Sequence, residues 1–146
     1  MLMYGMAHDR TANSTIALRW APRGVAMKKV KTEPPIDFRS ARERTILAYK
    51  TGAATRSEVC DAQPELMRNA VNCGVPSANR CPICGSNSMV EVLYVFGPRL
   101  PAGGRCIVTN KDMDRIRRWA GEFTAYDVEV CTECKWNHLV RINPVL

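Results

Sequence analysis

The sequence predicts an α+β fold, in which a small N-terminal helical region precedes an antiparallel β module with an inserted helix. Three observations predict it: two Cys-x-x-Cys pairs lie in the C-terminal half, helix-capping patterns gather before residue 77, and alternating apolar segments follow the cysteine pairs. We therefore expect a basic, disordered leader and linker over residues 1–37, a helical region of two or three short helices over 38–76, and the β module over 77–146.

The two cysteine pairs, Cys81-Pro82-Ile83-Cys84 and Cys131-Thr132-Glu133-Cys134, indicate a metal site. Each pair holds two thiolates on one tight turn. Two such turns folded together present four sulfurs at the corners of a tetrahedron, which is the coordination of structural Zn²⁺. The predicted ligands of one structural zinc ion are Cys81, Cys84, Cys131 and Cys134.

Other uses of these cysteines stay open. The segment between the pairs, residues 85–130, is 46 residues long, whereas a compact finger has a gap of about 15 to 20. The segment must therefore have structure of its own. The alternatives to zinc are a disulfide pair, a redox Cys-x-x-Cys site, and iron held by four cysteines as in rubredoxin. The redox site is the least favoured, because no thioredoxin-like βαβ setting is visible.

A basic linker over residues 28–37 leads into the first predicted helix. Pro34-Pro35 stiffens the linker and excludes a helix there. Residues 40–43 have the Ser-x-x-Glu form of a capping box, with Asp37 as an alternative cap one turn earlier. Gly52 ends this helix.

Two more short helices are predicted before the first cysteine pair. Residues 55–58 form a second capping box, and Pro64 suits the first turn of a helix over residues 65–72 that ends at Gly74. The pair resembles a helix-turn-helix in which Arg68 and Asn69 reach base edges. A small bundle is the favoured alternative, with a buried set of Val59, Leu66, Met67 and Val71.

The C-terminal module contains, in order, a strand, a helix and two strands. Alternation predicts a strand over residues 89–96, and a short strand at 106–108 leads to a helix over 111–120. The last strands cover residues 124–130 and 138–142. The cysteine pairs precede the first strand and separate the last two. This order is that of a zinc ribbon-like module with an inserted helix.

Two side chains follow the second cysteine pair closely, Trp136 and His138. Trp136 is expected to cover the metal loop, with base stacking as the alternative. His138 is expected to be exposed or to lie around the metal ligands without binding the metal, and the alternatives are that it replaces a cysteine as ligand or hydrogen-bonds a ligand sulfur.

The net charge of +7 is concentrated near the N-terminus, because residues 1–50 contribute +6 and residues 81–146 only +1. Such an excess favours electrostatic contact with nucleic acid or with an acidic partner. The predicted nucleic-acid contacts are Lys28, Lys29, Lys31, Arg39, Arg42 and Arg44.

No apolar run approaches the ~20 residues of a membrane helix, and residues 1–27 lack the apolar centre of a secretory signal. We therefore expect a cytoplasmic protein with reduced or metal-bound cysteines. Met27, which precedes Lys28-Lys29, is an alternative start to Met1.

Several stretches between about Arg44 and the end of the chain form a specific combination. They are Val59-Cys60-Asp61-Ala62, Pro64-Glu65-Leu66, Cys81-Pro82-Ile83-Cys84, Tyr94-Val95-Phe96-Gly97-Pro98-Arg99, Val128-Glu129-Val130-Cys131 and Cys134-Lys135-Trp136-Asn137-His138-Leu139-Val140. In these stretches the chain resembles a family of small uncharacterised actinobacterial proteins, a domain of unknown function. The resemblance implies a small zinc-ribbon protein and supplies no activity.

These features lead us to expect a non-catalytic zinc-binding adaptor that docks on nucleic acid or on the transcription or translation machinery. The alternatives are a protein-only interaction module, which uses the apolar strand and the loop over residues 96–105, and a rubredoxin-like iron or redox- or zinc-sensing protein. An enzyme is not expected. The chain has only His8 and His138 as histidines, no paired acidic motif lies in the module, and four cysteines leave a zinc ion no open position.

Overall fold

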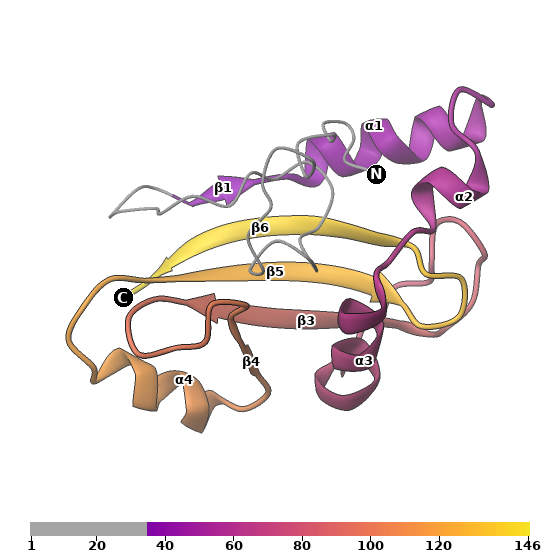
Figure 1. Ribbon diagram of the computed structural model, residues 1–146. Coiled ribbons are helices and arrows are strands. Elements are labelled where there is room, and N and C mark those ends of the chain that lie inside the picture. Colours follow the sequence, from indigo (N-terminus) through magenta and orange to yellow (C-terminus); the bar gives the residue numbers. More distant parts are fainter. Residues whose placement is uncertain (1–34) are drawn as a thin grey trace.

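A six-stranded antiparallel sheet organises the computed structural model, which describes residues 35–146 (Figure 1). The strands follow the order β1-β6-β5-β3-β2, and β4 also pairs with β3. They are β1 (Ile36–Asp37), β2 (Val75–Pro76), β3 (Met89–Phe96), β4 (Arg105–Ile107), β5 (Phe123–Cys131) and β6 (Asn137–Val145).

The three long strands β3, β5 and β6 form the centre of the sheet. The β3–β5 ladder runs without interruption from the pair Met89 and Cys131 to the pair Phe96 and Thr124. Alternating apolar residues fit such a ladder, because one face of each strand then meets the core. The strand predicted over residues 89–96 has the predicted limits, and the other three predicted strands are present with shifted or longer limits. The predicted α+β fold is confirmed.

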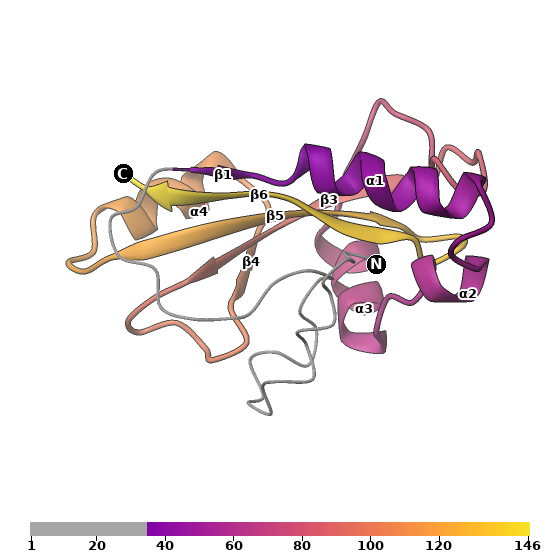
Figure 2. The same cartoon turned by 90° about the horizontal axis from the view of Figure 1, so that it is seen from above.

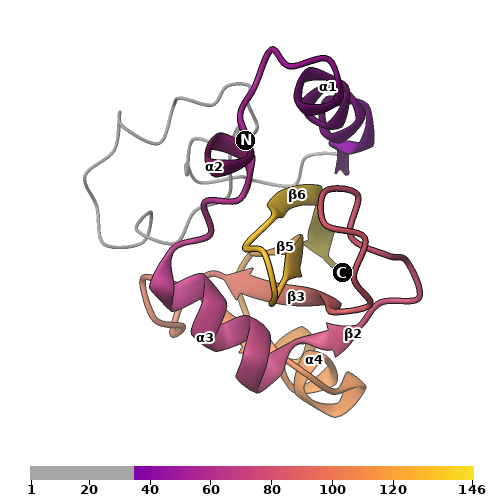
Figure 3. The same ribbon diagram turned by 90° about the vertical axis from the view of Figure 1, so that its right-hand side faces the viewer.

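Four helices lie around this sheet: α1 (Arg39–Lys50), α2 (Arg56–Val59), α3 (Pro64–Cys73) and α4 (Asn110–Arg117). Successive side chains of a strand point to opposite faces, so β3 places Tyr94 in the cluster with α3 and Val95 in the cluster with α4. Figures 2 and 3 show α1 and α3 on opposite sides of the sheet. Each helix buries its apolar side on the sheet.

The predicted bundle of short helices is therefore wrong. Val59 of α2 and Leu66 of α3 are buried in separate clusters, each with residues of the sheet and not with each other. Val71, expected in the bundle, is 70% exposed. The helix-turn-helix alternative also loses a contact residue, because Asn69 Nδ2 donates a 2.8 Å hydrogen bond to Tyr94 Oη on the sheet.

Local signals fix most helix starts. Thr55 and Glu58 make both hydrogen bonds of a capping box at α2, and Pro64 opens α3, as predicted. The pattern at residues 40–43 does not cap α1. That helix begins at Arg39, whose backbone N–H donates to Asp37 Oδ1 at 2.8 Å.

One end of the sheet carries an apolar cluster that includes cysteines. Ile46 of α1, Val59 of α2, Met89 and Trp136 pack there with Cys81 and Cys131, and all six side chains are buried. Helices α1 and α2 thereby enclose the end of the sheet to which both Cys-x-x-Cys turns belong.

Candidate metal centre

The structure brings together the four cysteines that the sequence predicts as ligands. One sulfur from each of Cys81, Cys84, Cys131 and Cys134 lies within 4.8 Å of the other three. The Sγ atoms of Cys81 and Cys134 are 3.6 Å apart, and those of Cys84 and Cys131 are 3.7 Å apart. A tetrahedral ion with metal–sulfur bonds of about 2.3 Å requires sulfur separations of about 3.8 Å. The donor set and its spacing fit such an ion.

The two Cys-x-x-Cys turns, called the first knuckle (residues 81–84) and the second knuckle (residues 131–134), have the same backbone design. The N–H of Gly85 donates to Cys81 O, and the N–H of Lys135 donates to Cys131 O, each at 3.0 Å. Both donors have a positive φ, 78° at Gly85 and 75° at Lys135. Lysine therefore occupies a left-handed position that favours glycine.

A pair of substitutions tests this design. Gly85→Ala is expected to lower the free energy of unfolding by about 1 kcal/mol, because a Cβ is disfavoured at positive φ. No atom lies within 4 Å of that Cβ position, so strain is the only cost. Lys135→Gly relieves the same strain and should leave stability unchanged or slightly higher. Urea unfolding of the metal-loaded chain measures the stability of both variants. An equal loss of unfolding free energy in Gly85→Ala and Lys135→Gly would contradict the shared positive-φ geometry of the two knuckles.

Burial of the sulfurs makes a cation necessary for full ionisation. Cys81 and Cys131 are buried, whereas Cys84 and Cys134 are partly exposed. The hydrogen bond with Cys134, followed by burial, raises the pKa of Cys81 above its ordinary value. Metal binding requires all four thiolates. A bound divalent cation would supply the charge that lets this crowded group ionise.

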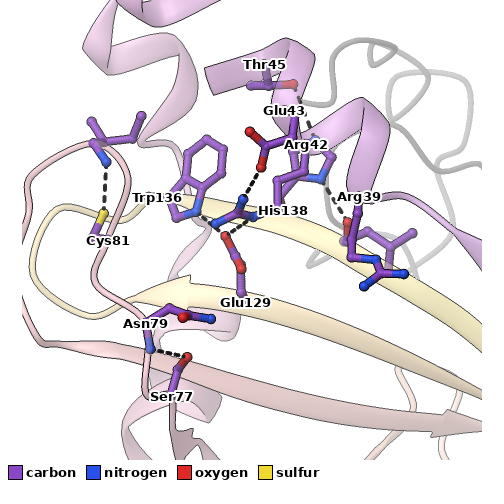
Figure 4. Close-up of polar contacts among 12 residues, drawn as sticks. Arg39, Arg42, Glu43, Thr45, Ser77, Asn79, Cys81, Glu129, Trp136 and His138 are labelled. Atoms are coloured by element: carbon purple, nitrogen blue, oxygen red, sulfur yellow. Dashed lines mark hydrogen bonds and ion pairs between the residues drawn. The ribbon is translucent and has the colours of Figure 1, made fainter. Parts of the chain in front are cut away.

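A buried polar contact lies directly behind the second knuckle (Figure 4). The indole Nε1 of Trp136 and the guanidinium Nε of Arg42 each donate a 2.7 Å hydrogen bond to Glu129 Oε2. Trp136 is fully buried. It covers the metal loop as expected, and no surface is left on it for stacking with a base.

His138 is also fully buried and does not belong to the sulfur group. Its Nε2 lies 3.3 Å from Thr45 Oγ1 of α1, and its Nδ1 lies 2.8 Å from the carbonyl oxygen of Leu139. Its ring stacks on Trp136 with centroids 5.8 Å apart. The expectation of an exposed side chain is wrong, because α1 packs over this part of β6. His138 supports Trp136 and α1.

Asp127, two residues before Glu129 on the same face of β5, has a carboxyl group of raised pKa. Burial, and next the neighbouring Glu91 carboxylate, raises the pKa of Asp127 to about 6, although Arg141 at 3.7 Å acts in the opposite direction. The unfolded value is about 3.9. The folded chain thus holds this proton more tightly, and ionised Asp127 lowers stability increasingly between pH 4 and pH 6.

Asp127→Asn should therefore stabilise the chain in a pH-dependent manner. We expect a gain of about 1–2 kcal/mol above pH 6, after discounting for partial exposure, and a smaller gain at pH 5. Urea unfolding of the metal-loaded chain from pH 5 to pH 8 measures it. Asp114→Asn, which removes an exposed carboxylate of α4, is the control. A gain independent of pH would contradict the prediction.

Two residues near the sulfurs were not identified from the sequence. Ser86 Oγ lies 3.3 Å from Cys84 Sγ and 3.5 Å from Cys131 Sγ. Cys60 has its thiol 3.5 Å from Cys134 Sγ. Neither residue belongs to a Cys-x-x-Cys motif, so only the folded structure shows that they lie beside the sulfur atoms.

The structure places the predicted nucleic-acid contacts in different settings. Lys28, Lys29 and Lys31 lie outside the described residues. Arg39 and Arg44 are exposed on α1, and Arg39 pairs with Asp37. The Arg42 side chain is only 17% exposed and is held by Glu129 and Glu43. The Arg42 guanidinium therefore neutralises the buried Glu129 carboxylate and does not face solvent as a nucleic-acid contact would.

A family model of unknown function, DUF5318, matches residues 31–144. The chain belongs to the DUF5318 family. The uncharacterized proteins Rv0049 of Mycobacterium tuberculosis (strain H37Rv) and Mb0050 of Mycobacterium bovis are each 41% identical to this DUF5318 member over 101 residues. The matches cover 68% of this chain and 74% of each relative. They confirm the resemblance to small uncharacterised actinobacterial proteins.

No solved structure matches this DUF5318 chain. Among the helices described in residues 35–146, none has the length and apolar character needed to cross a membrane.

Proposed function

We propose that the chain is a non-catalytic zinc-binding adaptor, which docks on nucleic acid or on the transcription or translation machinery. One observation carries the zinc part of the proposal: four cysteine sulfurs lie within 4.8 Å of one another at nearly tetrahedral spacing. Four thiolates complete the shell of a structural zinc ion and leave no position for a substrate.

The zinc ion would be held by one cysteine pair before β3 and one between β5 and β6. It would fix the relative positions of the two knuckles, which α1 and α2 cover. A rigid end of the sheet with helices around it is a scaffold suited to docking. This step rests on the architecture, since the fold alone does not specify a partner.

The outer side of α1 supports a role in binding an anionic partner. Arg44 is exposed there, Arg39 is exposed and paired with Asp37, and Arg42 is anchored to the interior. Exposed arginines on one helix can contact phosphates without rearrangement of the core. The protein-only alternative is weaker, because β3, its proposed contact strand, is paired along both edges by β5, β2 and β4.

Metal identity is tested first, on the full chain purified without added metal. Elemental analysis should give one zinc per chain, and the solution should be colourless. Iron in place of zinc would give a red protein and would favour the rubredoxin-like alternative.

Docking is tested with the zinc-loaded chain and short RNA and DNA duplexes and single strands at several salt concentrations. We expect salt-sensitive binding that Arg39→Ala with Arg44→Ala weakens, with a salt slope lower by about 2. Arg115→Ala with Arg117→Ala removes the same charge from α4 and should have less effect. Absence of salt-sensitive binding, and no polymerase or ribosomal proteins recovered from a mycobacterial lysate, would overturn the proposal.

A further inference from the structure

A fifth sulfur lies beside the proposed metal ligands. The Cys60 thiol donates to Cys134 Sγ at 3.5 Å, while Cys81 Sγ lies 3.6 Å from the same sulfur atom. Cys60 is not one of the four mutually close cysteines. Cys134 is thus in contact with one fellow ligand and with one thiol outside the shell.

Two hydrogen bonds hold the Cys60 segment against the second knuckle. The N–H of Ala62 donates to Lys135 O at 3.1 Å, and Asn137 Nδ2 donates to Asp61 Oδ1 at 3.0 Å. These contacts involve the two residues after Cys60 and residues on the C-terminal side of Cys134. One backbone and one side-chain hydrogen bond therefore keep the Cys60 segment beside the second knuckle.

The exposure of the cysteines decides which sulfurs an oxidant in solution can reach. Cys81 is 3% exposed and Cys131 is fully buried, whereas Cys84 and Cys134 are partly exposed ligands. Cys134 is the one of these two that contacts the partly exposed thiol of Cys60. Cys60 follows the last residue of α2, a four-residue helix, and lies outside the sheet. The chain between α2 and α3 can therefore move by the ~1.5 Å that separates this contact from a disulfide bond without breaking a strand pairing.

We propose that Cys60 and Cys134 form an oxidation-sensitive pair, in which a peroxide converts the two sulfurs to a disulfide and releases the metal. The inference rests on the proposed zinc site. It adds an oxidant as the chemical class of molecule to which that site responds, and it assigns Cys60 as the residue that makes the response reversible.

The reaction needs only the peroxide as co-reactant. The Cys134 thiolate attacks one peroxide oxygen, the O–O bond breaks, and hydroxide leaves, so that Cys134 becomes a sulfenic acid. The Cys60 sulfur then attacks the Cys134 sulfur, the S–O bond breaks, and the S–S bond forms. The departing hydroxide takes the Cys60 proton and leaves as water. Two electrons pass from the sulfurs to the peroxide, and a dithiol reductant reverses the oxidation of the pair.

The consequence for the metal follows from the ligand count. A sulfur in a disulfide is no longer a thiolate, so the site keeps three of its four ligands. The metal ion is expected to leave, and the second knuckle loses the constraint that the ion imposes.

The experiment treats the zinc-loaded full chain with hydrogen peroxide, follows zinc release with a chromogenic chelator, and maps disulfides by mass spectrometry after alkylation. The test variant is Cys60→Ser. The control is Cys73→Ser, which removes another partly exposed cysteine that is outside the sulfur group.

We expect the wild type and Cys73→Ser to release zinc with a Cys60–Cys134 crosslink and to recover zinc after reduction. Cys60→Ser should form no crosslink to Cys134 and should regain at least about tenfold less zinc after reduction, because its Cys134 sulfenic acid proceeds to irreversible oxidation. If Cys60→Ser does not fold, the crosslink mapped in the wild type still decides the matter. A main crosslink between Cys81 and Cys134, or equal recovery of zinc after reduction in the two variants, would overturn this inference while leaving the zinc site intact. A chain that takes up no zinc would instead overturn the proposed function.

Discussion

Cys131→Ser is expected to abolish metal binding and to unfold the end of the molecule that contains both knuckles. Cys131 is fully buried between Met89 and Trp136, and its loss removes one ligand and leaves a hydroxyl group among apolar side chains. Structural zinc contributes about 10–16 kcal/mol to small zinc modules. We expect a loss of more than about 5 kcal/mol, which equals the whole stability of many domains of this size.

Elemental analysis and thermal unfolding measure this effect, and a strong zinc chelator should reproduce it in the wild type. The matched control is Cys73→Ser, which keeps the four-sulfur group intact and should unfold within a few degrees of the wild type. Cys131→Ser that retains one zinc per chain and a normal melting temperature would rule out a structural metal at this site.

Arg42→Met is expected to cost about 3–5 kcal/mol, because it leaves the Glu129 carboxylate buried without its cation. Burial already raises the pKa of Glu129, although Arg42 and Trp136 act in the opposite direction. Without Arg42 the carboxyl group should hold its proton to still higher pH. The folded state then favours the protonated form, so the cost should be largest at neutral pH and smaller at pH 5.

Urea unfolding at pH 7 and pH 5 measures this cost. Arg44→Met changes an exposed arginine two residues along the same helix and should stay within about 0.5 kcal/mol of the wild type. Combining Arg42→Met with Glu129→Met should recover much of the loss, since the unpaired charge is then gone. A double variant whose loss of unfolding free energy equals the sum of the two single-variant losses would contradict the pairing of Arg42 with Glu129.

Local patterns were sufficient to predict the long strands and the ligand set. Apolar residues alternate along β3 because one side of the strand meets the core. A Cys-x-x-Cys motif specifies its own tight turn within four consecutive residues. The cap at Thr55 and the start of α3 at Pro64 are local for the same reason. The start of α1 is different. Asp37 pairs with Arg141 in the β1–β6 ladder, and this tertiary contact places its carboxylate where it accepts from Arg39 N–H.

Contacts between distant segments could not be predicted. Arg42 and Glu129 are 87 residues apart in sequence, and Cys60 and Cys134 are 74 apart. Each of these residues has an ordinary local explanation, as a surface arginine on a helix or as a small core cysteine. Only the packing of α1 and α2 over the end of the sheet determines their partners.

The wide separation of the two knuckles determines when the site can form. A ribosome adds about 5–20 residues per second, so the 50 residues from Cys84 to Cys134 take about 3–10 seconds to make. During that time the first knuckle offers two sulfurs and no complete shell. A metal ion held by all four sulfurs could therefore be bound only after Cys134 has been made, late in biogenesis, and a nascent chain that stalls before Cys134 would lack a complete ligand set.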